Sequence, residues 1–151
     1  MRNRGIIRGS AIVACAAVAS GAGAAVEVYS GDEGRAAWES DVGTWNEMDF
    51  TGFEPGFNPT DEYLDSVGAV FVDGFNPVWG ETFTLFSEDG WGLSSGFFGS
   101  RIEFELEAPT LSLALLYPGG MDVTLWSGDE VVFETSAGGA GFGNFIGLLS
   151  T

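Results

Sequence analysis

Three tryptophans stand where an indole ring could stack on a sugar. Trp79 and Trp91 are each followed by glycine in loop-like stretches, and Trp126 is out of phase with the apolar residues Val123 and Leu125 of its own strand. An indole has a flat apolar face and one polar N–H group, so an exposed ring beside carboxylates suits the face of a sugar. Tryptophans are also ordinary core residues, so glycan stacking by Trp79, Trp91 and Trp126 is a hypothesis set against plain packing.

Acidic residues beside glycine suggest a second chemistry. Asp73 and Asp89 each precede a glycine, and Asp129 follows one. Calcium takes about six to eight oxygen ligands. The sequence has no Asp-x-Asp-x-Asp-Gly loop, and Asp–Gly pairs also form turns without a metal. A Ca²⁺ site drawing on Asp73, Asp89 and Asp129 is therefore a hypothesis, and Ca²⁺ is the one cofactor that the sequence suggests.

Composition excludes most enzyme classes. The 151 residues include 22 acidic and 5 basic ones, no histidine, and a formal net charge of −17; all five basic residues are arginine. Histidine relays, P-loops and Schiff-base sites need residues that are missing, and so acidic a chain does not bind nucleic acid. Paired carboxylates can cleave glycosides, but Glu103, Glu105 and Glu107 are more simply a solvated strand face. We expect no enzyme.

Residues 1–24 have the three parts of a secretory signal peptide. Arginines near the start precede an apolar stretch at 11–19, and small residues end at Ala24. A membrane-spanning helix is the weaker alternative, because the apolar stretch is shorter than the roughly 20 residues that a bilayer needs. Cys15 fits a loose lipoprotein box but follows too short an apolar run. We expect cleavage after Ala24, a secreted protein and no stable membrane span.

Short strand-like runs dominate the rest of the chain. One helix is expected over 35–41, after a capping box of Ser30 and Glu33, and it ends near Gly43. Strands are predicted at 45–50, 67–72, 82–86, 101–107, 110–117, 121–127, 130–135 and 145–149, with a hairpin turn at 128–129. Alternation in two of them directs these side chains to the core: Ile102, Phe104, Leu106, Leu111, Leu113 and Leu115.

At least seven short strands with this spacing predict an all-β fold. We expect a two-layer antiparallel β-sandwich of jelly-roll type with one short N-terminal helix. No linker divides the chain, so a single domain over 25–151 follows the signal peptide 1–24. The apolar final run at 145–149 has no closing turn after it, which predicts an exposed strand edge and a domain truncated at its last strands.

Four segments carry a resemblance to a known family. They are residues 29–38, 48–56, 63–71 and 143–150, which include Met48-Asp-Phe-Thr-Gly-Phe and Asn144-Phe-Ile-Gly. They resemble secreted bacterial β-sandwich proteins of the PEP-CTERM, exosortase-sorted type, here without the C-terminal sorting segment. These motifs are framework motifs, so the resemblance implies a fold and an extracellular address rather than a site.

The sequence therefore predicts a secreted, non-catalytic extracellular or cell-surface β-sandwich protein with a structural, matrix or interaction role. The alternative is a carbohydrate-binding module with structural calcium, whose partner is an extracellular polysaccharide. A glycoside-acting enzyme is the third alternative. The acidic excess favours solubility and repels like-charged polymers.

Overall fold

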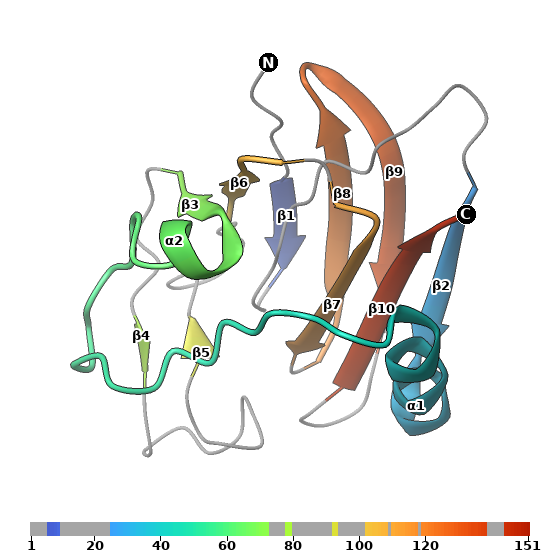
Figure 1. The fold of residues 1–151 in the computed structure, drawn as a ribbon, viewed down its shortest axis with the longest axis horizontal. Coiled ribbons are helices and arrows are strands. Elements are labelled where there is room, and N and C mark those ends of the chain that lie inside the picture. The colour runs from blue at the N-terminus through green and yellow to red at the C-terminus, as the bar shows by residue number, and fades with distance from the viewer. Residues whose placement is uncertain are drawn as a thin grey trace.

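A computed structural model of the chain describes residues 25–72, 78–79, 92–93, 102–108, 110–117, 119–138 and 144–151, and the backbone of 6–9. Within these residues the fold is mostly β, with small antiparallel sheets and one helix of note (Figure 1). This part of the fold prediction is confirmed. The elements are β1 (Ile6–Gly9), β2 (Val26–Ser30), α1 (Gly31–Val42), α2 (Leu64–Val67), β3 (Ala69–Phe71), β4 (Val78–Trp79), β5 (Gly92–Leu93), β6 (Phe104–Leu106), β7 (Ser112–Tyr117), β8 (Met121–Ser127), β9 (Glu130–Ala137) and β10 (Asn144–Ser150).

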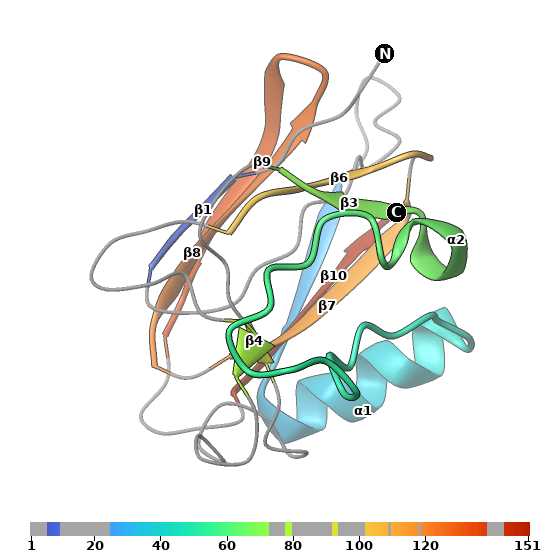
Figure 2. The ribbon, with the colours of Figure 1, turned by 90° about the vertical axis from the view of Figure 1, so that its left-hand side faces the viewer.

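The described strands form two three-stranded sheets and two short pairs. One sheet has the order β2-β10-β7 and the other β1-β8-β9, while β3 pairs with β6 and β4 with β5. Figure 2 shows the β1-β8-β9 sheet on one side of the β2-β10-β7 sheet and α1 on the other. No sheet of the described residues closes on itself. The central layer is thus covered by a helix on one face.

Strand β10 is the middle strand of its sheet. It pairs antiparallel with β2 from Ile146 opposite Ser30, and with β7 from Asn144 opposite Tyr117. The prediction that this last strand exposes an edge is therefore wrong, because strands on both sides satisfy its backbone groups. Ala25 and Thr151 extend the β2–β10 pairing, since each N–H donates to the other residue's carbonyl oxygen.

The main core combines strands from both three-stranded sheets. Leu115 and Tyr117 of β7, Ile146 and Leu148 of β10, and three residues of β8 all belong to one buried cluster. The β8 residues are Met121, Val123 and Leu125, which alternate along the strand as a half-buried strand requires. The same cluster continues into an aromatic group around Phe50, Tyr63, Phe71 and Phe104.

Helix α1 begins earlier than predicted and ends as predicted. It starts at Gly31, directly after β2, and it stops at Gly43, whose φ of 77° suits a residue without a side chain. The predicted capping box is wrong, because Ser30 makes no side-chain cap hydrogen bond. Ser30 is instead the last paired residue of β2 and has extended backbone angles. The Tyr29 hydroxyl lies 2.8 Å from Glu27 Oε2 and 2.9 Å from Asp41 Oδ2, which ties β2 to α1.

Three predicted strands are wrong in part or in whole. In the described part of the predicted strand 101–107, only Phe104–Leu106 form a strand, β6. Residues 45–50 form no strand, because none of the described strands pairs with them. The run 67–72 is shorter than predicted: Val67 ends α2, Gly68 takes a left-handed φ of 74°, and only Ala69–Phe71 pair with β6. The predicted strand 82–86 lies outside the described residues.

Burial corrects two further predictions. Glu103 is buried rather than solvated, because it precedes β6 between the buried Ile102 and Phe104. Leu111 is exposed rather than inward, because it stands before β7 begins, whereas Leu115 is buried as expected. The β8–β9 hairpin with its turn at Gly128 is confirmed.

Candidate functional site

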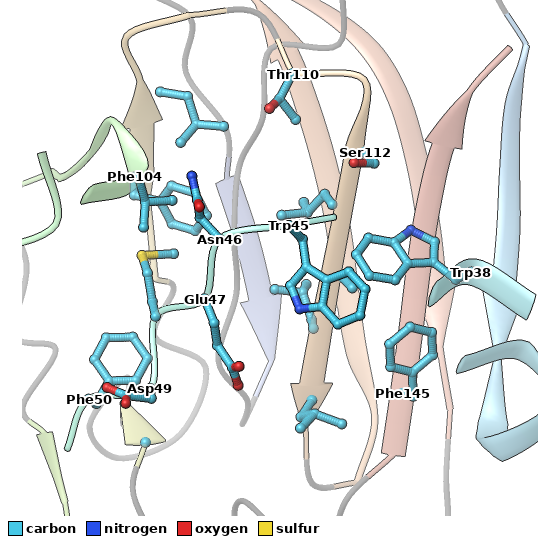
Figure 3. A pocket seen from close by; sticks show the side chains of 18 of the residues that line it. Trp38, Trp45, Asn46, Glu47, Asp49, Phe50, Phe104, Thr110, Ser112 and Phe145 are labelled. Carbon is cyan, nitrogen blue, oxygen red and sulfur yellow. The ribbon is translucent and has the colours of Figure 1, made fainter. Parts of the chain in front are cut away.

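A cavity of about 450 Å³ lies between α1, β7 and the irregular segment 44–50 (Figure 3). Volumes of roughly 300–1,000 Å³ are typical of small-molecule sites. Aromatic side chains line much of it: Trp38, Trp45, Phe50, Phe71, Phe104 and Phe145. We call it the Trp45 pocket, because this residue is the exposed ring in its wall.

Trp38 of α1 forms the floor of the pocket. Its indole is buried, and its Nε1–H donates to the carbonyl oxygen of Leu148 at 3.2 Å. The indole can approach β10 this closely because Gly147 has no side chain. A Cβ at position 147 would lie only 2.5 Å from Trp38 Cδ1. Phe145 adds an edge contact with a ring-centroid distance of 6.0 Å. The floor of the pocket is thus fixed by packing.

Trp45 stands on this floor and faces outward. Its ring centroid lies 5.6 Å from that of Trp38, and 46% of the residue is exposed. Figure 3 shows the Trp45 ring beside Trp38, in front of β7. An exposed indole offers a flat apolar face on which a ligand ring can stack.

The segment that carries Trp45 is anchored at both ends. At its start the Trp45 ring packs on Trp38. At its end Phe50 is buried in the core with a left-handed φ of 57°, and its N–H donates to the Tyr63 hydroxyl at 2.8 Å. A non-glycine residue in this backbone region is held by its surroundings. The residues between these anchors therefore lie along the pocket in a defined order.

Polar groups line the same pocket as the exposed ring. Asn46, Glu47 and Asp49 are exposed on the same segment, and Thr110 and Ser112 lie across the pocket (Figure 3). Carboxylate, amide and hydroxyl groups are the donors and acceptors that sugar hydroxyls need. An apolar face with a few polar groups around it is the usual composition of a ligand site.

The charged residues that line the pocket differ in the hydrogen-bond and ion-pair partners that they already have. Arg35 Nε donates to Glu39 Oε1 at 2.9 Å, one helical turn along α1. Asp49 accepts from the backbone N–H and the hydroxyl of Thr51. Glu47, by contrast, makes no hydrogen bond or ion pair with the described part of the chain. Glu47 is the acid that stays available to a ligand.

The structure describes few of the site residues that were predicted from the sequence. Asp73, Asp89 and Trp91 lie outside the described residues, and Trp79 is described only as a paired residue of β4. Trp126 lies on β8, half-buried, and its Nε1 is enclosed without a hydrogen-bond partner among the described residues. It does not line the Trp45 pocket, so its stacking on a glycan stays a prediction.

Asp129 is exposed in the turn between β8 and β9. Where side chains are described, no three His, Cys, Asp or Glu residues gather as a metal cluster. The calcium hypothesis stays a prediction. No helix within the described ranges is long and apolar enough to cross a membrane.

Sequence reasoning missed Trp45 because it placed the residue in a strand. The available signal was its position directly after a helix-ending Gly43, in a run that continues with Asn46 and Glu47. Binding residues are disproportionately found on loops that a rigid scaffold positions.

Comparisons of the chain with protein-family models, with curated proteins and with solved structures find no match.

Proposed function

We propose that this chain is a secreted, non-catalytic binding module for an extracellular carbohydrate, with its site in the Trp45 pocket. The observation that carries the proposal is the half-exposed Trp45 ring, held by Trp38 at a centroid distance of 5.6 Å in the wall of a pocket of about 450 Å³. Of the two roles expected from sequence, interaction rather than a passive matrix role fits such a pocket best.

Rigidity of the ring supports binding. The Trp45 segment is fixed by Trp38 at one end and by Phe50 at the other, so little side-chain freedom is lost when a ligand arrives. Preorganised groups of this kind bind more tightly for the same contact. The amide of Asn46 and the hydroxyls of Thr110 and Ser112 line the same pocket, and such groups bond the hydroxyls of a sugar that stacks on the ring.

The acids of the pocket favour binding over cleavage. A glycosidase needs two carboxyl groups on opposite sides of the scissile bond. Three of the described residues that line the pocket are acids: Glu39 is paired with Arg35, Asp49 accepts two hydrogen bonds from Thr51, and Glu47 makes no such contact within the described part of the chain. A Glu47 without a partner among the described residues, beside two acids that already have partners, suits recognition of a ligand, which is the role that we propose.

The extracellular address is supported by the signal-peptide pattern in 1–24 and by the resemblance to PEP-CTERM-type proteins. Ala25, the first residue after the expected cleavage site, is paired with Thr151 through both backbone groups. The order of layers in Figure 2 and the shared core of β7, β8 and β10 support a two-layer sandwich of jelly-roll type. The proposal also includes a structural calcium ion, which the sequence suggests together with carbohydrate binding.

A glycan array with two tryptophan variants tests this function. We expect the protein to bind one group of extracellular polysaccharides, Trp45→Ala to abolish that binding, and Trp126→Ala to keep it. Circular dichroism of both variants checks that the fold is retained. Binding that is lost in Trp126→Ala but kept in Trp45→Ala would move the site to β8. Silence across plant, algal and bacterial glycans would overturn the function and leave a structural or matrix role.

A further inference from the structure

The charge of the Trp45 pocket selects among carbohydrate classes. Among the described residues that line it are one arginine and three acids, so these residues together carry a negative charge, and the whole chain carries −17. A surface of one sign raises the local concentration of the opposite charge and repels its own. Uronic-acid and sulfated polymers are therefore unfavourable ligands.

Arg35 does not alter this balance. Its guanidinium is bound to Glu39 at 2.9 Å, so these two charges offset each other within α1. The other two carboxylates that line the pocket are those of Glu47 and Asp49, which follow Trp45 in the same segment. Asp49 already accepts two hydrogen bonds from Thr51. Glu47 is the exposed carboxylate whose full bonding capacity is left for a ligand.

The indole of Trp45 favours a cationic ligand, as the acids of the pocket do. The face of an indole carries negative electrostatic potential and attracts a cation placed within about 6 Å of the ring centre. Trp45 presents such a face to solvent, and Glu47 follows it by two residues in the same anchored segment. A ligand with an apolar ring face and an ammonium group satisfies both residues at once.

We infer that the Trp45 pocket binds an amino sugar in its ammonium form, as in a de-acetylated glucosamine polymer. The inference rests on the proposed carbohydrate-binding function and adds the charge of the ligand. The sugar face stacks on Trp45, and the ammonium group donates to the Glu47 carboxylate. Acetylation of the amine removes the charge and with it the contact to Glu47.

Calorimetric titration of the purified protein with a glucosamine oligomer, its N-acetylated counterpart and a galacturonate oligomer tests the inference. We expect the glucosamine oligomer to bind at least 5-fold more tightly than the acetylated one, and the galacturonate oligomer not to bind. Glu47→Gln should weaken the glucosamine oligomer about 2- to 5-fold, the range of one exposed ion pair, and should leave the acetylated oligomer unchanged. Added salt should weaken the charged ligand alone.

Glu130→Gln is the matched control, because it removes the same charge from an exposed site outside the pocket. It should leave all affinities unchanged. Equal binding of both glucosamine oligomers, lost in Trp45→Ala but unaffected by Glu47→Gln, overturns the inference and keeps the proposed function. Failure of every oligomer to bind, or binding that Trp45→Ala leaves intact, overturns both.

Discussion

The indole of Trp38 rests directly on the backbone of Gly147. A Cβ atom at position 147 would lie 2.5 Å from Trp38 Cδ1 and 2.6 Å from Trp38 Cγ, closer than non-bonded atoms approach. Gly147 is buried in the middle of β10, and Trp38 comes from α1. This contact joins the helix to the central sheet and sets the floor of the Trp45 pocket.

Gly147→Ala should therefore destabilise the protein. Overpacking at a closely packed site costs about 1–3 kcal/mol of the free energy of unfolding, and Trp38 must move away from β10. Urea denaturation measures this cost. Gly138→Ala is the matched control, because its added methyl group meets no heavy atom within 4 Å; we expect a change below about 0.5 kcal/mol. Equal stability of the two variants would contradict the packing described.

Tyr63→Phe should destabilise the segment that carries Trp45. The Tyr63 hydroxyl accepts the buried Phe50 N–H at 2.8 Å, and its loss leaves that N–H unsatisfied. The cost of such a group is about 1–3 kcal/mol. Denaturation of Tyr63→Phe and Tyr29→Phe side by side measures it, because Tyr29 bonds only exposed carboxylates and should change stability by less than about 0.5 kcal/mol. A larger loss of stability in Tyr29→Phe than in Tyr63→Phe would contradict the role of the Phe50 hydrogen bond as an anchor.

Local patterns predicted the parts of the fold that depend on neighbouring residues. The β8–β9 hairpin follows from alternation around a Gly128-Asp129 turn, and the end of α1 follows from Gly43. The strand Val26–Ser30 was not predicted, because its burial alternates poorly and its partner β10 lies more than a hundred residues away. Its pairing depends on long-range contacts that no local pattern contains.

The candidate site depended on long-range contacts even more strongly. Residues 45–50 mix apolar and polar side chains in a way that also fits a strand, and only the absence of a ladder partner among the described strands leaves Trp45 free to line a pocket. Its neighbour Trp38 is fixed by Gly147, far along the chain. The sequence indicated the chemistry of exposed indoles but not the residue that supplies it.

All three tyrosines should ionise above the ordinary pKa of about 10 in the folded protein. Hydrogen bonds to Glu27 and Asp41 raise the pKa of Tyr29, and burial raises the pKa of Tyr63 and of Tyr117. The fold thus favours the neutral phenols. Their contribution to stability is complete below the unfolded pKa and is lost as pH rises through the raised values.

Phenolate absorbance at 295 nm, followed together with circular dichroism, checks this prediction. We expect little phenolate while the fold is intact at pH 10, and a rise of absorbance that accompanies unfolding at higher pH. A midpoint near 10 for all three phenols, with native circular dichroism, would show that neither burial nor the carboxylates act on them.

Export should remove residues 1–24 and with them β1, which leaves β8 paired with β9. We expect the secreted protein to begin at Ala25 and to contain no cysteine, because Cys15 leaves with the signal peptide. Mass spectrometry of the protein from the culture medium measures the N-terminus. An intact Met1 or a lipid-modified Cys15 would contradict the expected processing.

The most direct test of carbohydrate binding at the Trp45 pocket is an NMR titration that follows the five tryptophan indole N–H signals while a glucosamine oligomer is added. Substitution of each tryptophan by phenylalanine in turn assigns the signals. We expect the indole signals of Trp45 and Trp38 to shift with a common dissociation constant and the signal of Trp126 not to shift. Shifts confined to Trp126, or no shift of any indole at millimolar oligomer, would contradict this expectation.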